Sequence, residues 1–150
     1  MNPSIYISFD IRHDHGLYER LVDQSGAAGF TVSSGSESEV AASAVEIWDA
    51  RVRRRIREAD QMIVICGQHS DASECMSDEI RIAREEGTPY FLLWGRRETM
   101  CTKPAGAKND EGMYNWTPAI LQNQIAIALR SRVRALSVAE DTARLRSERR

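Results

Sequence analysis

Short apolar runs alternate along the chain with longer segments in which apolar residues recur every three or four positions. The clearest run is MIVIC at 62–66, which is continuous, rich in β-branched residues and ended by Gly67. Such a run is typical of a strand buried on both faces. The same criteria predict strands at residues 4–9, 29–32, 62–66 and 90–94, and helices at about residues 17–26, 45–59 and 74–86 and from Thr117 onward.

The ends of these helices carry recognisable signals. Gly26 and Gly87 are expected to follow the first and third helices, because glycine is the commonest residue just beyond a helix C-terminus. Three polar residues precede the third helix as candidate N-caps: Ser70, Asp71 and Ser73.

Strands and helices that alternate in this order predict an α/β fold with a mostly parallel sheet and helices on both faces. Four strands are evident, and there is room for a fifth within residues 95–116, an irregular segment interrupted by Gly, Pro and Asn. A loop of this length in a small domain is usually functional or mobile. Residues 1–136 are expected to form one domain, followed at 137–150 by a basic C-terminal helical extension or tail.

Composition narrows the class of protein. A chain of 150 residues suits a single domain with its own core, and a net charge of −2 gives no indication of nucleic-acid or membrane binding. The three cysteines show no metal-binding spacing and no CxxC motif, which favours a reducing compartment. Because the sequence shows no signal peptide and no transmembrane run, we expect a cytoplasmic protein.

The motifs do not support several kinds of site. The sequence has no glycine-rich phosphate loop, no GxGxxG after the first strand and no GxSxG elbow. His13 and His15 are two positions apart with no evident third ligand, so we expect no metal site. The five arginines within residues 51–57 could bind phosphate, but such a run is more often the solvated face of a helix, which is the interpretation we favour.

One acidic residue is out of place in the third predicted helix. At about 100° per residue, Glu79 projects into the apolar arc of the helix, between Met76 and Ile82. A carboxylate there is desolvated, paired or facing a cleft. Two interpretations stay open: a functional carboxylate, or an edge glutamate that bends out to water or meets an arginine.

A second candidate stands where the first strand ends. Alternation along that strand places Tyr6 and Ser8 on one face and Phe9 on the other. Asp10 follows at the carboxyl end, which is where ligands bind in doubly wound sheets. Asp10 suits a site residue and equally suits the N-cap of the next helix.

Five segments keep a characteristic order and spacing: ISFD at 7–10, IREADQMIVICGQHS at 56–70, Glu79-Ile80 in its helix, GTPYFLLWG at 87–95 and MYNWT at 113–117. Together they resemble the TIR-like domains of bacterial antiphage defence, in particular the TIR-like subunit of Thoeris systems, over about residues 5–130. The resemblance implies a flavodoxin-like TIR fold, a three-layer sandwich around four or five strands. It also implies chemistry on NAD+, in which the nicotinamide–ribose bond is cleaved and an ADP-ribose-derived signal is made.

The resemblance also assigns roles to residues. Glu79 lies where the family keeps its catalytic glutamate, so the resemblance and the helical spacing point to the same residue. The chain departs from the family in having Asp78, where relatives often have an aromatic residue, and no residue within 33–44 aligns with the so-called BB loop. The positions that match the substrate-binding loops of the family are Ser8, Phe9, Asp10, Gly67 and His69.

The resemblance thus implies an enzyme of the NAD+ nucleosidase or ADP-ribosyl cyclase type, with NAD+ as substrate and no cofactor. Its product is expected to be an ADP-ribose-derived, cyclic nucleotide that signals to a separate effector. We expect self-association and activation by a phage-derived signal, because the loops at 33–44 and 95–116 beside the pocket are rich in Gly, Ser and Pro. Two alternatives remain: a non-catalytic interaction module, and a receiver-like phosphoacceptor at Asp10, for which a lysine at the end of a later strand is missing.

Overall fold

The computed structural model describes residues 3–33 and 45–130, so the predicted tail at 137–150 and nearly all of the segment 33–44 lie outside the described residues. A helix beginning at residue 118 follows the named elements. None of the helices described is both long enough and apolar enough for a membrane span. The named elements are β1 (Ser4–Ser8), α1 (His15–Ala28), β2 (Thr31–Ser33), α2 (Val45–Glu58), β3 (Gln61–Cys66), η1 (Ser70–Ala72), α3 (Glu74–Glu86), β4 (Tyr90–Trp94) and β5 (Met113–Asn115).

The described strands form one parallel sheet in the order β2-β1-β3-β4-β5. The first strand therefore lies between β2 and β3, and its register pairs Tyr6 with Met62 and Ser8 with Val64. The fifth strand falls within residues 95–116, where the sequence left room for one. The predicted α/β fold with a mostly parallel sheet is confirmed.

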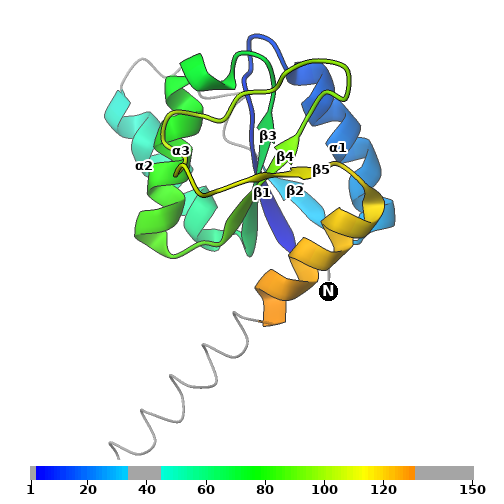
Figure 1. Ribbon diagram of the computed structural model, residues 1–150. Helices are drawn as coiled ribbons and strands as arrows, with labels where there is room; N and C mark the ends of the chain where they lie inside the picture. Colours follow the sequence, from blue (N-terminus) through cyan, green and yellow to red (C-terminus); the bar gives the residue numbers. More distant parts are fainter. Residues whose placement is uncertain (1–2, 34–44, 131–150) are drawn as a thin grey trace, which may run out of the picture.

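Helices cover both faces of the sheet and give the fold three layers (Figure 1). The helices α2 and α3 lie side by side on one face, and α1 and the helix from residue 118 lie on the other. Each face has its own core. One cluster joins Ile7 of β1 to Leu21 of α1, and the other joins Tyr6 of β1 to Ile80 of α3, as alternation along β1 predicts.

The helix ends follow from short local signals. Ser73 caps α3 by accepting a hydrogen bond from the backbone N–H of Met76 at 3.3 Å, and Gly87 ends that helix with a left-handed φ of 72°. The predicted end of α1 at Gly26 is wrong. The helix continues through this residue to Gly29, whose φ of 82° favours glycine and whose N–H bonds two carbonyls of the last turn.

The long segment between β4 and β5 is built onto α3. The ammonium group of Lys103 donates to the backbone carbonyls of residues 108, 109 and 111 at 3.1, 3.1 and 2.8 Å. The N–H of Gly106 donates to the hydroxyl of Ser77 at 2.9 Å, and a Cβ at Gly106 would lie 2.9 Å from the Ser77 carbonyl oxygen. These contacts hold the segment beside the helix that carries Glu79.

The arginine-rich helix α2 pairs with acidic residues of α3. Arg53 contacts Glu85 at 2.7 Å and Glu86 at 3.1 Å, and Arg81 of α3 reaches back to Asp49 at 3.4 Å. Exposed ion pairs of this kind contribute at most about 1 kcal/mol each. The arrangement agrees with a solvated helix face rather than a phosphate site.

Candidate functional site

Glu79 lies on α3 with its side chain turned toward the sheet. The apolar residues Met76, Ile80 and Ile82 around it are fully buried, and Glu79 itself is only 6% exposed. The apolar stripe of α3 belongs to the core cluster that includes Tyr6 and residues of β3, which fixes this orientation of the helix. The carboxylate that helical spacing placed inside the apolar arc is therefore buried.

Two hydroxyl groups of β1 contact this carboxylate. Tyr6 and Ser8 are two positions apart on the strand, so both point to the face that α3 covers. The Tyr6 hydroxyl donates to Oε2 of Glu79, and the Ser8 hydroxyl donates to Oε1 at 3.0 Å. Because a buried charge is tolerated only when it is paired or hydrogen-bonded, β1 supplies the polar contacts that this position of α3 needs.

Burial raises the pKa of Glu79 to about 7 from an ordinary value of 4.5. Desolvation is the largest cause. The hydrogen bonds from Tyr6 and then Ser8 lower this pKa, and the negative charge of Asp78 raises it. Glu79 is thus partly ionised near neutral pH, which is the range that acid–base and electrostatic catalysis use.

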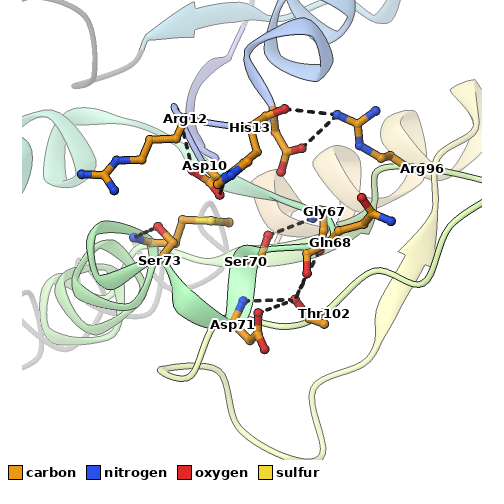
Figure 2. Close-up of polar contacts among 12 residues, drawn as sticks. Asp10, Arg12, His13, Gly67, Gln68, Ser70, Asp71, Ser73, Arg96 and Thr102 are labelled. Carbon is orange, nitrogen blue, oxygen red and sulfur yellow. Dashed lines mark hydrogen bonds and ion pairs between the residues drawn. The ribbon is translucent and has the colours of Figure 1, made fainter.

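The loop after β1 is organised by Asp10. Its carboxylate accepts a hydrogen bond from the N–H of Arg12 at 3.0 Å and lies 2.8 Å from Nδ1 of His13 (Figure 2). The N-cap residue of α1 is Asp14, so the interpretation of Asp10 as the cap of that helix is wrong. Asp10 stays a candidate site residue at the carboxyl edge of the sheet.

The loop after β3 meets the loop after β1. The N–H of Gly67 donates to the Ser70 hydroxyl at 2.8 Å, as Figure 2 shows. The ring of His69 lies over the ring of His13, with 4.1 Å between the centroids. The structure therefore brings Asp10, Gly67 and His69 to one edge of the sheet.

Phe9 lies on the other side of the sheet from Glu79. Its ring belongs to the core cluster on the α1 face and stacks on Tyr18 with 4.6 Å between the centroids. The structure does not bring the Phe9 side chain to Glu79, and the substrate-binding role that the resemblance implies for Phe9 stays a prediction.

An ion pair of the buried Asp14 with the partly exposed Arg96 lies beside Gly67 and is not evident from the sequence. Asp14 is 1% exposed, and its Oδ1 contacts the guanidinium of Arg96 at 3.1 Å. Its Oδ2 has no hydrogen-bond partner in the described part of the chain, and a Cβ at position 67 would lie 2.1 Å from that oxygen. A side chain at position 67 would thus force the Asp14 side chain to shift. In the sequence, the only local sign of this close approach is that a glycine, Gly67, directly follows the buried strand β3.

A hollow of about 280 Å³ lies at the N-terminal end of α3, and Glu79 does not line it. Three acidic side chains around the hollow disfavour the diphosphate of a nucleotide there. Among residues 3–33 and 45–130, no three or more His, Cys, Asp or Glu side chains are grouped so as to hold a metal ion. The residues that line the hollow are Asp71, Ala72, Ser73, Glu74, Ser77, Asp78 and Ala105.

Comparison with known families gives one match. The family model described as "Thoeris protein ThsB, TIR-like domain" matches residues 6–98. The matched residues begin in β1 and extend past β4, so they include Tyr6, Ser8 and Glu79. A search of curated proteins found no match.

Solved structures share the fold at low sequence identity. The crystal structure of the TIR domain of the Toll-related receptor TRR-2 from Hydra magnipapillata aligns with 87% of this chain and 97% of its own, at 13% identity and a TM-score of 0.53. The TIR domains of the activated Roq1 resistosome, which directly recognizes the pathogen effector XopQ, align with 61% of this chain and 57% of theirs, at 9% identity and a TM-score of 0.47. The similarity to the Hydra TIR domain shows that this chain has a TIR-like fold.

Proposed function

The chain belongs to the family of TIR-like domains of the Thoeris protein ThsB, and on this basis we propose that it consumes NAD+ by cleaving the bond between nicotinamide and ribose. The observation that carries the proposal is the Glu79 carboxylate, buried beneath α3 and hydrogen-bonded by Tyr6 and Ser8. In this proposal NAD+ is the substrate and no cofactor is needed.

The charge of Glu79 fits the chemistry. Loss of neutral nicotinamide leaves positive charge on the ribose, as in glycoside cleavage. An ionised carboxylate in surroundings of low polarity stabilises that charge more strongly than a carboxylate in water does. The deprotonated form of Glu79 is therefore the active one, and its role is to hold the ribose and stabilise the transition state.

The group that attacks the ribose next determines the product. Water gives ADP-ribose, and a hydroxyl of the same molecule gives a cyclic nucleotide. We propose a cyclic, ADP-ribose-derived nucleotide that reaches a separate effector by diffusion. Mass spectrometry of the products formed from NAD+ tests this part of the proposal.

The central experiment compares two glutamate variants of α3. Glu79→Gln should abolish nicotinamide release because an amide carries no charge to oppose the positive ribose. Glu74→Gln is the matched control, since Glu74 is exposed on the same helix. Release that survives in Glu79→Gln, or that is lost equally in Glu74→Gln, would contradict the assignment of Glu79.

One observation favours a second candidate function. Both oxygens of Glu79 already accept hydrogen bonds within the protein, which fits a structural residue of a TIR-like domain that binds a partner without turnover. Such an interaction module would release no nicotinamide at any protein concentration, with or without lysate from infected cells.

We further propose that the protein has low activity until it self-associates or receives a phage-derived signal. Glu79 is 6% exposed, so the groups around it must move before a ribose reaches it. Misplacement by about 1 Å costs on the order of a hundredfold in rate. The initial rate should rise more steeply than protein concentration and should rise again with lysate from infected cells. A rate proportional to concentration that ignores lysate would refute this proposal.

A further inference from the structure

We propose that Tyr6 is a positioning residue for Glu79: its hydroxyl anchors Oε2 and favours the ionised group, while Oε1, which accepts from Ser8, is the oxygen that the substrate contacts once the site opens. The inference rests on the proposed function of Glu79 for its catalytic meaning. The contact itself does not depend on that function: the structure shows the Tyr6 hydroxyl donating a hydrogen bond to Oε2 of Glu79, a residue 73 positions later in the sequence.

Tyr6 is buried among apolar side chains. Tyr6 is 1% exposed and belongs to the core cluster that includes Met76 and Ile80 of α3. A phenylalanine would bury the same ring without a hydroxyl that needs an acceptor. A tyrosine in this position therefore adds little to packing beyond what phenylalanine gives, and adds a hydrogen bond to the carboxylate of Glu79.

The two hydroxyls at Glu79 lie at different depths. Tyr6 is in the middle of β1 and binds Oε2, whereas Ser8 is the last residue of the strand and binds Oε1. Substrates of open parallel sheets enter from the carboxyl ends of the strands, so a ribose hydroxyl meets the Oε1 side first. Each carboxylate oxygen accepts up to two hydrogen bonds, and Tyr6 can therefore stay bound while the substrate binds.

Burial and the charge of Asp78 oppose the ionisation of Glu79. Burial raises the pKa of Glu79 most, Asp78 raises it further, and the hydrogen bond from Tyr6 lowers it more than the one from Ser8 does. Cys75 of α3 also lies within electrostatic range of Glu79. Removal of the Tyr6 hydroxyl alone should leave Ser8 to offset burial and the Asp78 charge.

The first test is a pH titration of Glu79 without NAD+, followed by carbon-13 NMR of its carboxyl group, which is assigned by its loss in Glu79→Gln. In Tyr6→Phe the midpoint should rise by about one to two pH units above the wild-type value of about 7. Ser8→Ala should raise it less. Tyr90→Phe is the matched control, because it removes a hydroxyl that binds Arg84 instead, and its midpoint should equal that of the wild type.

The second test measures nicotinamide release against pH in the same variants. The pH of half-maximal kcat/KM should move upward with the NMR midpoint in Tyr6→Phe, which a purely structural role would not produce. An NMR midpoint that is unchanged in natively folded Tyr6→Phe, or that rises more in Ser8→Ala, would overturn the inference.

A third measurement needs no variant of Tyr6. In the wild type, the hydroxyl proton of Tyr6 should resonate far downfield and move upfield as Glu79 takes up a proton; a signal that ignores this titration would also overturn the inference. If the wild type releases no nicotinamide under any condition, the proposed function fails, and the NMR titrations still decide the role of Tyr6.

Discussion

Replacement of Glu79 by glutamine should stabilise the fold at neutral and alkaline pH, although it removes the proposed catalytic group. The pKa of Glu79 is raised from 4.5 to about 7 by burial, so the folded protein keeps this proton longer than the unfolded chain does. The contribution of Glu79 to the free energy of unfolding therefore falls as pH rises from about 4.5 to about 7 and then levels off. A shift of about 2.5 pH units corresponds to about 3 kcal/mol, of which about 2.5 kcal/mol falls between pH 5 and pH 8.

Urea unfolding monitored by tryptophan fluorescence measures this difference, since the chain has three tryptophans. The free energies of unfolding of the wild type and of Glu79→Gln, extrapolated to water at each pH, should diverge by about 2.5 kcal/mol from pH 5 to pH 8. Other titrating groups cancel in the comparison because both proteins share them. Glu74→Gln should run parallel to the wild type over the same interval. A gap between Glu79→Gln and the wild type that stays constant with pH would show that Glu79 does not carry the raised pKa.

The remaining predictions concern packing, the ion pair and the rate. Gly67→Ala should lower the free energy of unfolding by about 1 to 3 kcal/mol, because the added methyl group would lie 2.1 Å from Asp14. Gly26→Ala should instead raise the free energy of unfolding by about 0.5 to 1 kcal/mol, because Gly26 lies inside α1 and an added methyl group there would have no neighbouring atom within 4 Å. Arg96→Met should lower it by about 2 to 3 kcal/mol in thermal or urea unfolding, less than for a fully buried pair since Arg96 is 39% exposed. The kcat/KM for nicotinamide release should rise with pH through a midpoint near the Glu79 pKa of about 7; a flat profile would contradict an ionised carboxylate as the active form.

The sequence predicted the fold well because its buried strands and amphipathic helices carry strong local patterns. The run at 62–66 and the cap Gly87 needed no tertiary information, and local sequence narrowed the N-cap of α3 to three residues that include Ser73. The strand β5 was harder to find, since its three residues are not fully buried and so show no apolar run. The end of α1 was misplaced because either Gly26 or Gly29 could follow a helix. The two differ in the backbone angle φ, which is positive at Gly29, and local sequence does not predict that angle.

The candidate site was predictable only in part. Helical spacing showed that Glu79 lies in an apolar arc, and strand alternation showed that Tyr6 and Ser8 share a face. That these three side chains meet depends on which face of the sheet α3 covers, and no local pattern specifies that face. The contact of Asp14 with Arg96 joins residues 82 positions apart, and neither residue stands out among its polar neighbours.

The central place of β1 also sets an order of events during synthesis. β1 is synthesised before both of its neighbours, β2 and β3, so one of its edges has no partner until Gln61–Cys66 has been made. The carboxylate that Tyr6 and Ser8 bind arrives later still, with α3. For much of translation the nascent chain therefore presents an open strand edge, which is the state in which chaperones bind and unfinished chains aggregate.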